Sequence, residues 1–182
     1  MPMPTLNEQQ IAWVVEQVAE YIDRQRQIYR RKAVLLNANQ RAAMRPFFPA
    51  STLDALRVTV LTGERVSNPP FYSALVQMGF EPAALPNFSL MAAITFVDTV
   101  VSHEAFSDRL LFHELVHVVQ YAKLGLGGFA DKYVWGFLRG GSYAAIPLEI
   151  NAYELDARFA AAPAKPFSVA DEVQGWINAG KL

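Results

Sequence analysis

The segment from Leu110 to Gln120 constrains the fold of this chain most, because it sets three ionisable side chains in an otherwise apolar helical stretch. It reads Leu-Leu-Phe-His-Glu-Leu-Val-His-Val-Val-Gln, and the ionisable residues are His113, Glu114 and His117. Residues four apart lie on one face of an α-helix, so the two imidazole rings converge. Burying such groups is costly unless something compensates them, and a shared metal ion does so. The segment therefore predicts a buried helix that carries a metal site.

Chance is a weak explanation of this pattern. With three histidines in 182 residues, random placement would produce His-Glu-x-x-His in about three of a thousand such chains. The remaining alternative is a metal-free helical protein in which the two histidines pack in the core with satisfied hydrogen bonds.

The ligand set must come from His, Asp and Glu, because the chain has no cysteine. Two histidines leave a zinc ion one protein ligand short of a catalytic site. A third histidine six residues after His117 is absent, since position 123 is Lys, and Gln120 stands where the metzincin pattern needs glycine. The carboxylates further along the chain are Asp131, Glu149, Glu154, Asp156, Asp171 and Glu172.

Glu149 is the best candidate for the third ligand. It follows Pro147, a residue suited to the first turn of a helix, and a charge-free run over 140–148. On that predicted helix the small Ala152 lies on the same face, which would allow a close approach to the first helix. Glu154 points about 140° away from this face, and we expect it to be solvated.

The combination of His113-Glu114-x-x-His117 with a later Glu149-x-x-Ala152 resembles the gluzincin branch of the zinc metallopeptidases. The segment 113–120 is also similar to short bacterial zincin-like domains. The resemblance covers residues 113–157, and it implies Zn²⁺ held by His113, His117 and Glu149, with Glu114 as the general base for a zinc-activated water. The implied function is a zinc metallopeptidase, an endopeptidase acting on a peptide or protein substrate.

The same resemblance also leaves a second function open. Some of the short bacterial domains are attached to toxins or injection systems. A non-catalytic zinc-binding zincin-like module in a toxin or secretion system is therefore the alternative function.

The partners of the zinc-binding imidazoles are less clear from the sequence. Gluzincins often place an Asp four residues after the ligand Glu, where it orients a zinc-bound His, but here that position is Tyr153. Ligating imidazoles usually donate their other N–H to an acceptor. Asp156, one turn further along the same face, is one candidate acceptor, and Asn151 or a backbone carbonyl are others.

Amide hydrolysis also needs a second electrophile beside the metal. Tyr143, beside two glycines, is the candidate catalytic residue for this role, and His103, just before the predicted active-site helix, is the other candidate. An ordinary amphipathic tyrosine and a loop histidine without a catalytic part are the alternatives. Tyr153 should lie near the site, and we expect it to pack in the core.

The remaining segments predict an α+β fold, a mostly helical zincin-like domain with a small sheet. Two strands are expected, over 58–62 and over 94–97 continuing towards 100–101. In zincins, a strand placed like 94–97 commonly pairs with the substrate main chain, whereas the alternative is a plain sheet strand. Helices are expected over 6–33, 71–78, 108–124, 131–138, 147–161 and from 168 onwards, with a loop from 41 to 46 and a short helix capped by Ser51 or Thr52 and reaching 56.

A single domain is expected over 1–182, with an N-terminal helical part (1–50), a catalytic core (51–162) and a C-terminal helix (163–182). Hydrophobic residues make up 52% of the chain, enough for a sizeable core. The net charge of −1 gives no field that favours nucleic acid or an anionic membrane. The longest charge-free stretches, 66–80 and 82–97, are too short for a membrane span. The first twenty residues do not resemble a secretory signal, so we expect a cytoplasmic protein or export by a non-Sec route.

Overall fold

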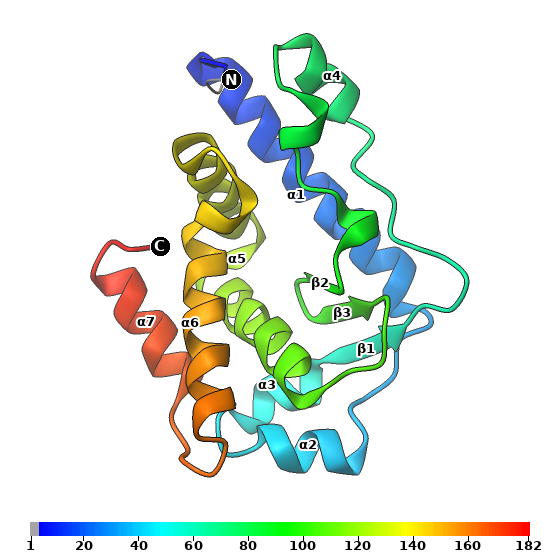
Figure 1. Ribbon diagram of the computed structural model, residues 1–182, viewed down its shortest axis with the longest axis vertical. Helices are drawn as coiled ribbons and strands as arrows, with labels where there is room; N and C mark the ends of the chain where they lie inside the picture. The colour runs from blue at the N-terminus through cyan, green and yellow to red at the C-terminus, as the bar shows by residue number, and fades with distance from the viewer. Residues whose placement is uncertain (1–3) are drawn as a thin grey trace.

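The computed structural model describes residues 4–182 and has a mostly helical α+β fold with a small sheet, as predicted (Figure 1). The sheet has three strands, one more than the two expected. Residues 1–3 of the expected N-terminal part lie outside the described residues. The helices are α1 (Glu8–Arg30), α2 (Ala38–Met44), α3 (Ala50–Ala55), α4 (Tyr72–Gln77), α5 (Asp108–Gly140), α6 (Pro147–Ala161) and α7 (Val169–Asn178). The strands are β1 (Arg57–Val60), β2 (Ala93–Phe96) and β3 (Thr99–Ser102), and the short 3₁₀ helices are η1 (Pro82–Ala84), η2 (Phe88–Leu90) and η3 (Tyr143–Ala145).

Helix α5 lies at the centre of the fold and is bent at Gly125. The Ser107 hydroxyl caps its start by accepting a hydrogen bond from the backbone N–H of Leu110 at 3.1 Å. Gly125 has φ 70° and ψ 169°, a conformation that glycine adopts without steric cost. The helix predicted to end at this glycine does end there, but the next helix begins at once. Every residue from 111 to 121 is buried, so other elements surround this half of α5 on all sides.

The sheet has the order β1-β3-β2, with β1 parallel and β2 antiparallel to β3. The expectation of one strand continuing from 94–97 towards 100–101 is wrong, because the chain reverses after β2 and forms a hairpin. Val97 has φ 61° in this turn, which is rare for a β-branched residue. No glycine or asparagine marks the reversal in the sequence, and Asp98 is its single turn-forming residue, so the local signal for a hairpin was weak.

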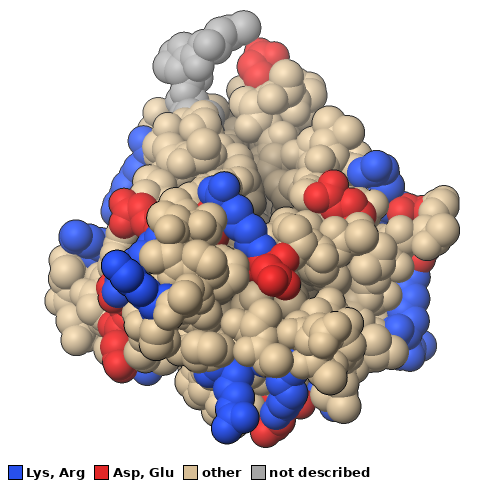
Figure 2. All heavy atoms as spheres, turned by 60° about the horizontal axis from the view of Figure 1, so that its bottom comes forward, with Lys and Arg blue, Asp and Glu red and all other residues tan. Residues whose placement is uncertain are grey.

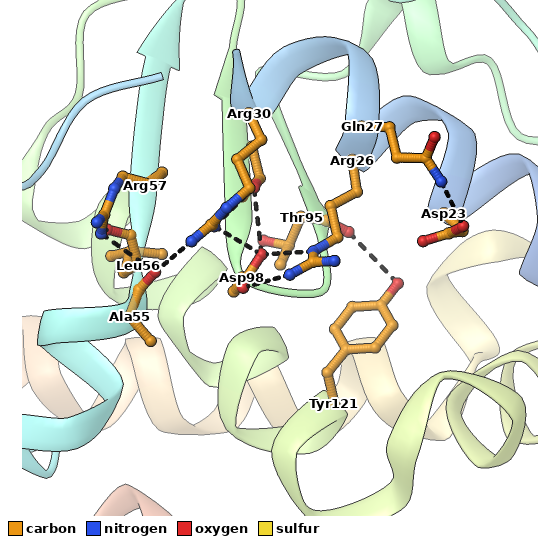
Figure 3. Close-up of polar contacts among 11 residues, drawn as sticks. Asp23, Arg26, Gln27, Arg30, Ala55, Leu56, Arg57, Thr95, Asp98 and Tyr121 are labelled. Atoms are coloured by element: carbon orange, nitrogen blue, oxygen red, sulfur yellow. Dashed lines mark hydrogen bonds and ion pairs between the residues drawn. The ribbon is translucent and has the colours of Figure 1, made fainter. Parts of the chain in front are cut away.

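The end of α1 is tied to this hairpin through Asp98 (Figure 3). Arg26 donates two hydrogen bonds to the Asp98 carboxylate, at 2.7 and 2.8 Å, and Arg30 lies 2.9 Å from it. Burial raises the pKa of Asp98. The hydrogen bonds from Arg26 and the positive charges of Arg26 and Arg30 have the larger, opposite effect, so the pKa lies below its ordinary value. The carboxylate is therefore ionised at neutral pH and holds the strained turn against the helix.

Two expectations for the segment between α1 and β1 are wrong. The predicted loop from 41 to 46 is helical over most of its length, because α2 extends to Met44. Asn37 caps α2 and forms a reciprocal capping box with Gln40. Helix α3 begins at Ala50 after Pro49, without a side-chain cap, so Ser51 and Thr52 lie inside it.

Helices α5 and α6 pack side by side (Figure 1), and small residues permit this close approach. Ala152 on α6 is fully buried, as its predicted place on the inner face requires. On α5, a Cβ at Gly136 would lie 2.6 Å from Pro147 Cδ, and one at Gly140 would lie 2.5 Å from Ala145 Cβ. Glycine at these positions therefore allows η3 and the start of α6 to pack against α5.

The surface carries both signs of charge. On the face shown in Figure 2, Lys and Arg side chains are interspersed with Asp and Glu. Within residues 4–182, no helix combines the length and the apolar character that crossing a membrane requires.

Candidate metal centre

Helices α5 and α6 bring His113, His117 and Glu149 together, as the sequence predicts. The Nε2 atoms of the two rings lie 3.3 Å apart. Glu149 Oε2 lies 3.5 Å from His113 Nε2 and 3.4 Å from His117 Nε2. All three side chains are buried, and one ligand atom from each lies within 4.8 Å of the others. Glu154, the rejected carboxylate, is exposed, as expected.

The partner of His113 is Asp156, one of the candidates from the sequence. Its Oδ2 atom lies 2.8 Å from His113 Nδ1, and Arg109 donates to Oδ1 of the same carboxylate at 2.9 Å. Since an ionised carboxylate only accepts hydrogen bonds, the imidazole must carry a proton on Nδ1. The Nε2 atom of neutral His113 therefore presents a lone pair to the site.

The partner of His117 is Gln120, a role that was not predicted from the sequence. Its Oε1 atom lies 2.8 Å from His117 Nδ1. The amide nitrogen of Gln120 donates to Leu148 O at 2.9 Å and to Asn151 Oδ1 at 3.0 Å, which identifies Oε1 as the acceptor end. His117 therefore also carries its proton on Nδ1. The available signal was the spacing of three residues, which puts His117 and Gln120 on one helix face. Asn151, a candidate acceptor for an imidazole, instead accepts a hydrogen bond from Gln120.

These assignments leave three electron-pair donors facing one point. Glu149 Oε2 is buried and has no hydrogen-bond partner within the described part of the chain. The two neutral imidazoles add their Nε2 lone pairs at a separation of 3.3 Å. Such a group is repulsive unless a cation or an additional proton lies between its members. Two imidazole nitrogens and one carboxylate oxygen form a donor set that suits a divalent metal ion, so this site can hold one.

Without a metal ion, protons take its place. Burial lowers the pKa of His113, but the hydrogen bond to Asp156 and the carboxylate of Glu149 outweigh it and raise the pKa to about 10. The pKa of His117 is also raised, because Glu149 outweighs the effect of burial. Burial raises the pKa of Glu149, and the two histidines outweigh it, so its pKa falls far below its ordinary value. The metal-free centre therefore holds protonated imidazole beside an ionised carboxylate.

Glu114 lies beside this group and is held by strand β2. Its side chain is buried, and the hydroxyl of Thr95 donates to Oε2 at 2.7 Å. Oε1 has no hydrogen-bond partner among residues 4–182. Thr95 comes from an element 19 residues earlier, so no helical spacing could have identified it. One carboxylate oxygen is thus anchored and the other remains available.

The two candidate electrophiles differ in their surroundings. Tyr143 on η3 lines the same two hollows as Glu114. Burial is the main cause that raises the pKa of Tyr143 well above its ordinary value, and the negative charge of Glu149 adds to it. The hydroxyl of Tyr143 therefore stays protonated. His103 binds backbone groups through both ring nitrogens, with Nδ1 2.6 Å from Met91 O and Nε2 accepting from Val66 N–H at 3.0 Å. His103 therefore links the loop at Val66 to the segment at Met91 by hydrogen bonds.

Tyr153 corrects another expectation. It was predicted to pack in the core, but it is 49% exposed. Its ring centroid lies 4.5 Å from that of His113, at the open side of the site. The reason is its position on α6, where Ala152 faces α5 and the next residue points towards the edge of the interface.

Two hollows meet at the site. An open one of about 320 Å³ is lined by polar residues that include Arg109, His113 and Asp156. A more enclosed one of about 100 Å³ is lined mainly by apolar side chains and reaches His117 and Glu149. Glu114 and Tyr143 line both hollows, so the candidate metal centre lies where an open polar hollow joins an apolar cavity.

Comparison of the chain with protein-family models, with curated proteins and with solved structures finds no match.

Proposed function

We propose that this protein is a zinc-dependent amide hydrolase of the metallopeptidase type, with Zn²⁺ held by His113, His117 and Glu149. The observation that carries the proposal is that Glu149 Oε2 is buried, has no hydrogen-bond partner among the described residues and faces two imidazole Nε2 atoms. The free carboxylate oxygen of Glu114 beside them adds a group for acid–base chemistry. The chemistry that a bound zinc ion supplies is Lewis acidity, which makes water more acidic and polarises a carbonyl group.

Glu114 is the proposed general base. It accepts a proton from the attacking water and passes it to the leaving amine. Thr95 keeps one oxygen of this carboxylate in place, at 2.7 Å from the threonine hydroxyl. The base then needs little reorganisation when the proton moves.

Tyr143 is the proposed hydrogen-bond donor to the negative charge that develops on the carbonyl oxygen. Its raised pKa keeps the phenol protonated at neutral pH, and its place beside both hollows gives it access to a bound substrate. A donor placed where charge develops stabilises the transition state more than the ground state.

Strand β2 is the proposed binding edge for the substrate main chain. It is the last strand of the sheet, and Ala93 lines both hollows. In an antiparallel pair, successive residues of a strand point their backbone N–H and C=O groups alternately towards the partner strand and away from it. His103 N–H donates to Ala92 O across the hairpin, so Ala92 points towards β3. The backbone groups of Ala93 and Thr95 therefore point to the free edge of β2. Thr95 O receives the Tyr121 hydroxyl at 3.4 Å (Figure 3), which leaves Ala93 as the residue to pair with an extended peptide.

The test combines metal content with turnover, using protein purified without a His tag. We expect about one zinc ion per chain, cleavage in a peptide library, loss of cleavage on chelation and its return with added zinc. Bound zinc without cleavage of any amide would favour the non-catalytic binding module. Protein that takes up no metal would overturn the proposal and leave the packed-histidine alternative.

A further inference from the structure

Arg109 lines the open polar hollow, and a buried carboxylate holds its guanidinium in place. The Nε atom of Arg109 donates to Asp156 Oδ1 at 2.9 Å, and its Nη2 atom lies 2.7 Å from the same oxygen. The other oxygen of Asp156 is bonded to His113 Nδ1. The side chain of Arg109 is 58% exposed, whereas that of Asp156 is only 4% exposed. The guanidinium is therefore fixed in orientation and still reachable from solvent.

The contacts with Asp156 use only part of the hydrogen-bonding capacity of Arg109. A guanidinium carries five N–H groups and is not deprotonated in proteins. Two of these groups are directed to Asp156, and the other three have no acceptor among residues 4–182. A pair of parallel N–H groups matches the two oxygens of a carboxylate and binds them with two hydrogen bonds. Arg109 therefore offers a preformed, positively charged edge for a carboxylate.

This edge lies close to the place of the proposed reaction. Arg109 precedes His113 by four residues on α5, a rise of about 6 Å, and both side chains line the same hollow as Glu114. Among the described residues that line this hollow, Arg109 is the single lysine or arginine. Because an extended peptide spans about 3.5 Å per residue, a group bound by Arg109 lies about two residues from an amide at the metal centre.

We propose that Arg109 binds a carboxylate of the substrate, carried about two residues from the amide that is hydrolysed. This inference rests on the proposed hydrolase function and makes the substrate a peptide with a negative charge near the cleaved bond. The carboxylate is the end of a peptide chain or the side chain of an Asp or Glu residue, and both sources offer the same pair of oxygens. Its bond to Arg109 aligns the scissile carbonyl with the metal centre and with Glu114.

Binding of small hydroxamates tests the role of Arg109 without requiring turnover. The probes are the monohydroxamates of succinic, glutaric and adipic acid, in which a zinc-binding group and a free carboxylate are separated by increasing distances. Each probe is compared with the matching carboxamide, which has nearly the same size and no charge. In calorimetry with the zinc-loaded protein, at least one acid should bind about tenfold more tightly than its carboxamide. Equal binding within all the pairs would overturn the inference.

Substitution of Arg109 separates binding of the carboxylate from support of the metal centre. Arg109→Gln should lower the preference for acid over carboxamide about tenfold, and Arg109→Lys, which keeps the charge without the paired donors, should lower it less. Arg139→Gln, at an exposed position on the same helix, should keep the full preference. An Arg109 that only held Asp156 in place would affect both members of a pair equally, so an unchanged preference in Arg109→Gln would contradict the inference.

Turnover identifies the source of the carboxylate and separates this inference from the function on which it rests. The probe is a peptide library prepared with a free C-terminus and again with a C-terminal amide. Cleavage that needs the free C-terminus identifies the chain end, whereas cleavage close to Asp or Glu in both preparations identifies a side chain. Cleavage that depends on neither would overturn the inference and leave the amide hydrolase standing. Preference for acids in binding without cleavage of any amide would overturn the hydrolase and retain the carboxylate site, and protein that takes up no zinc would overturn both.

Discussion

The Oε1 atom of Gln120 lies 2.8 Å from the Nδ1 atom of His117, one turn earlier on the same helix. The other end of the Gln120 amide donates to Leu148 O and Asn151 Oδ1 on α6. One fully buried side chain therefore orients an imidazole ring of the centre and joins α5 to the helix that supplies Glu149.

Replacing this side chain should weaken metal binding. Gln120→Leu removes the acceptor that keeps the proton of His117 on Nδ1, and we expect zinc affinity to fall about 10- to 100-fold. Competition with a chromogenic chelator measures the change, and circular dichroism checks that the variant folds. Gln174→Leu is the control, because the Gln174 side chain donates to Asn178 on its own helix, α7. Unchanged affinity in the first variant would show that the Gln120 bond does not orient the ring.

Removing the charge of Glu114 should separate metal binding from catalysis. Glu114→Gln keeps the shape of the side chain but cannot accept the water proton, so turnover should fall about 10²- to 10⁴-fold. Zinc content, measured by elemental analysis, should stay at the level of the unmodified protein. Glu154→Gln, at an exposed position, should match the unmodified protein in both measurements. Full activity in the Glu114 variant would exclude it as the base.

Metal binding should release protons and strengthen as the pH rises. In the metal-free protein the pKa of His113 is raised to about 10, so the ring is protonated at pH 7 and zinc must displace that proton. Affinity should therefore increase from pH 7 towards pH 10 and decrease below pH 7. Calorimetry at pH 7 in buffers of different ionisation enthalpy counts the released protons. Binding without proton release would contradict the protonated metal-free centre.

The ion pairs at the hairpin should contribute stability that acid removes. The folded-state pKa of Asp98 is lowered, so its contribution is present above the unfolded-state pKa and is lost as the pH falls through the folded-state value. Asp98→Asn should cost about 1 kcal/mol at pH 7, allowing for solvent screening. Urea unfolding at pH 7 and pH 3 measures this, and the cost should shrink at pH 3.

The control for the hairpin is Asp54→Asn. Asp54 pairs with Arg41, and 63% of its side chain is exposed, so this substitution should change the free energy of unfolding by no more than a few tenths of a kcal/mol. An equal loss from both substitutions would show that Asp98 contributes no more than an ordinary surface ion pair.

Some errors of prediction came from signals that were present but not used. The Asn37 and Gln40 pair forms the capping box of α2 in the segment before the predicted loop, and a helix start was readable there. The turn at Val97 and Asp98 had only a weak signal, because Asp98 is a turn-forming residue but Val97, which adopts the positive φ, is of a type that favours strands. Tyr153 is exposed although the neighbouring Ala152 is buried. The packing of α6 on α5 decides which residues lie at the border of the interface, and the sequence of α6 does not show this.

The sequence by itself determined local features, namely the helix starts and the side chains that share a helix face within a few residues of each motif. The spacing of His113 and His117 set both rings on one face, Ser107 began the helix, and Pro147 began the helix that carries Glu149. Tertiary structure decided which groups meet across elements: Asp156 with His113, Thr95 with Glu114, and the cavity between α1 and α5. The physical reason is that helix periodicity relates residues one turn apart, whereas contacts between distant segments depend on how whole faces pack.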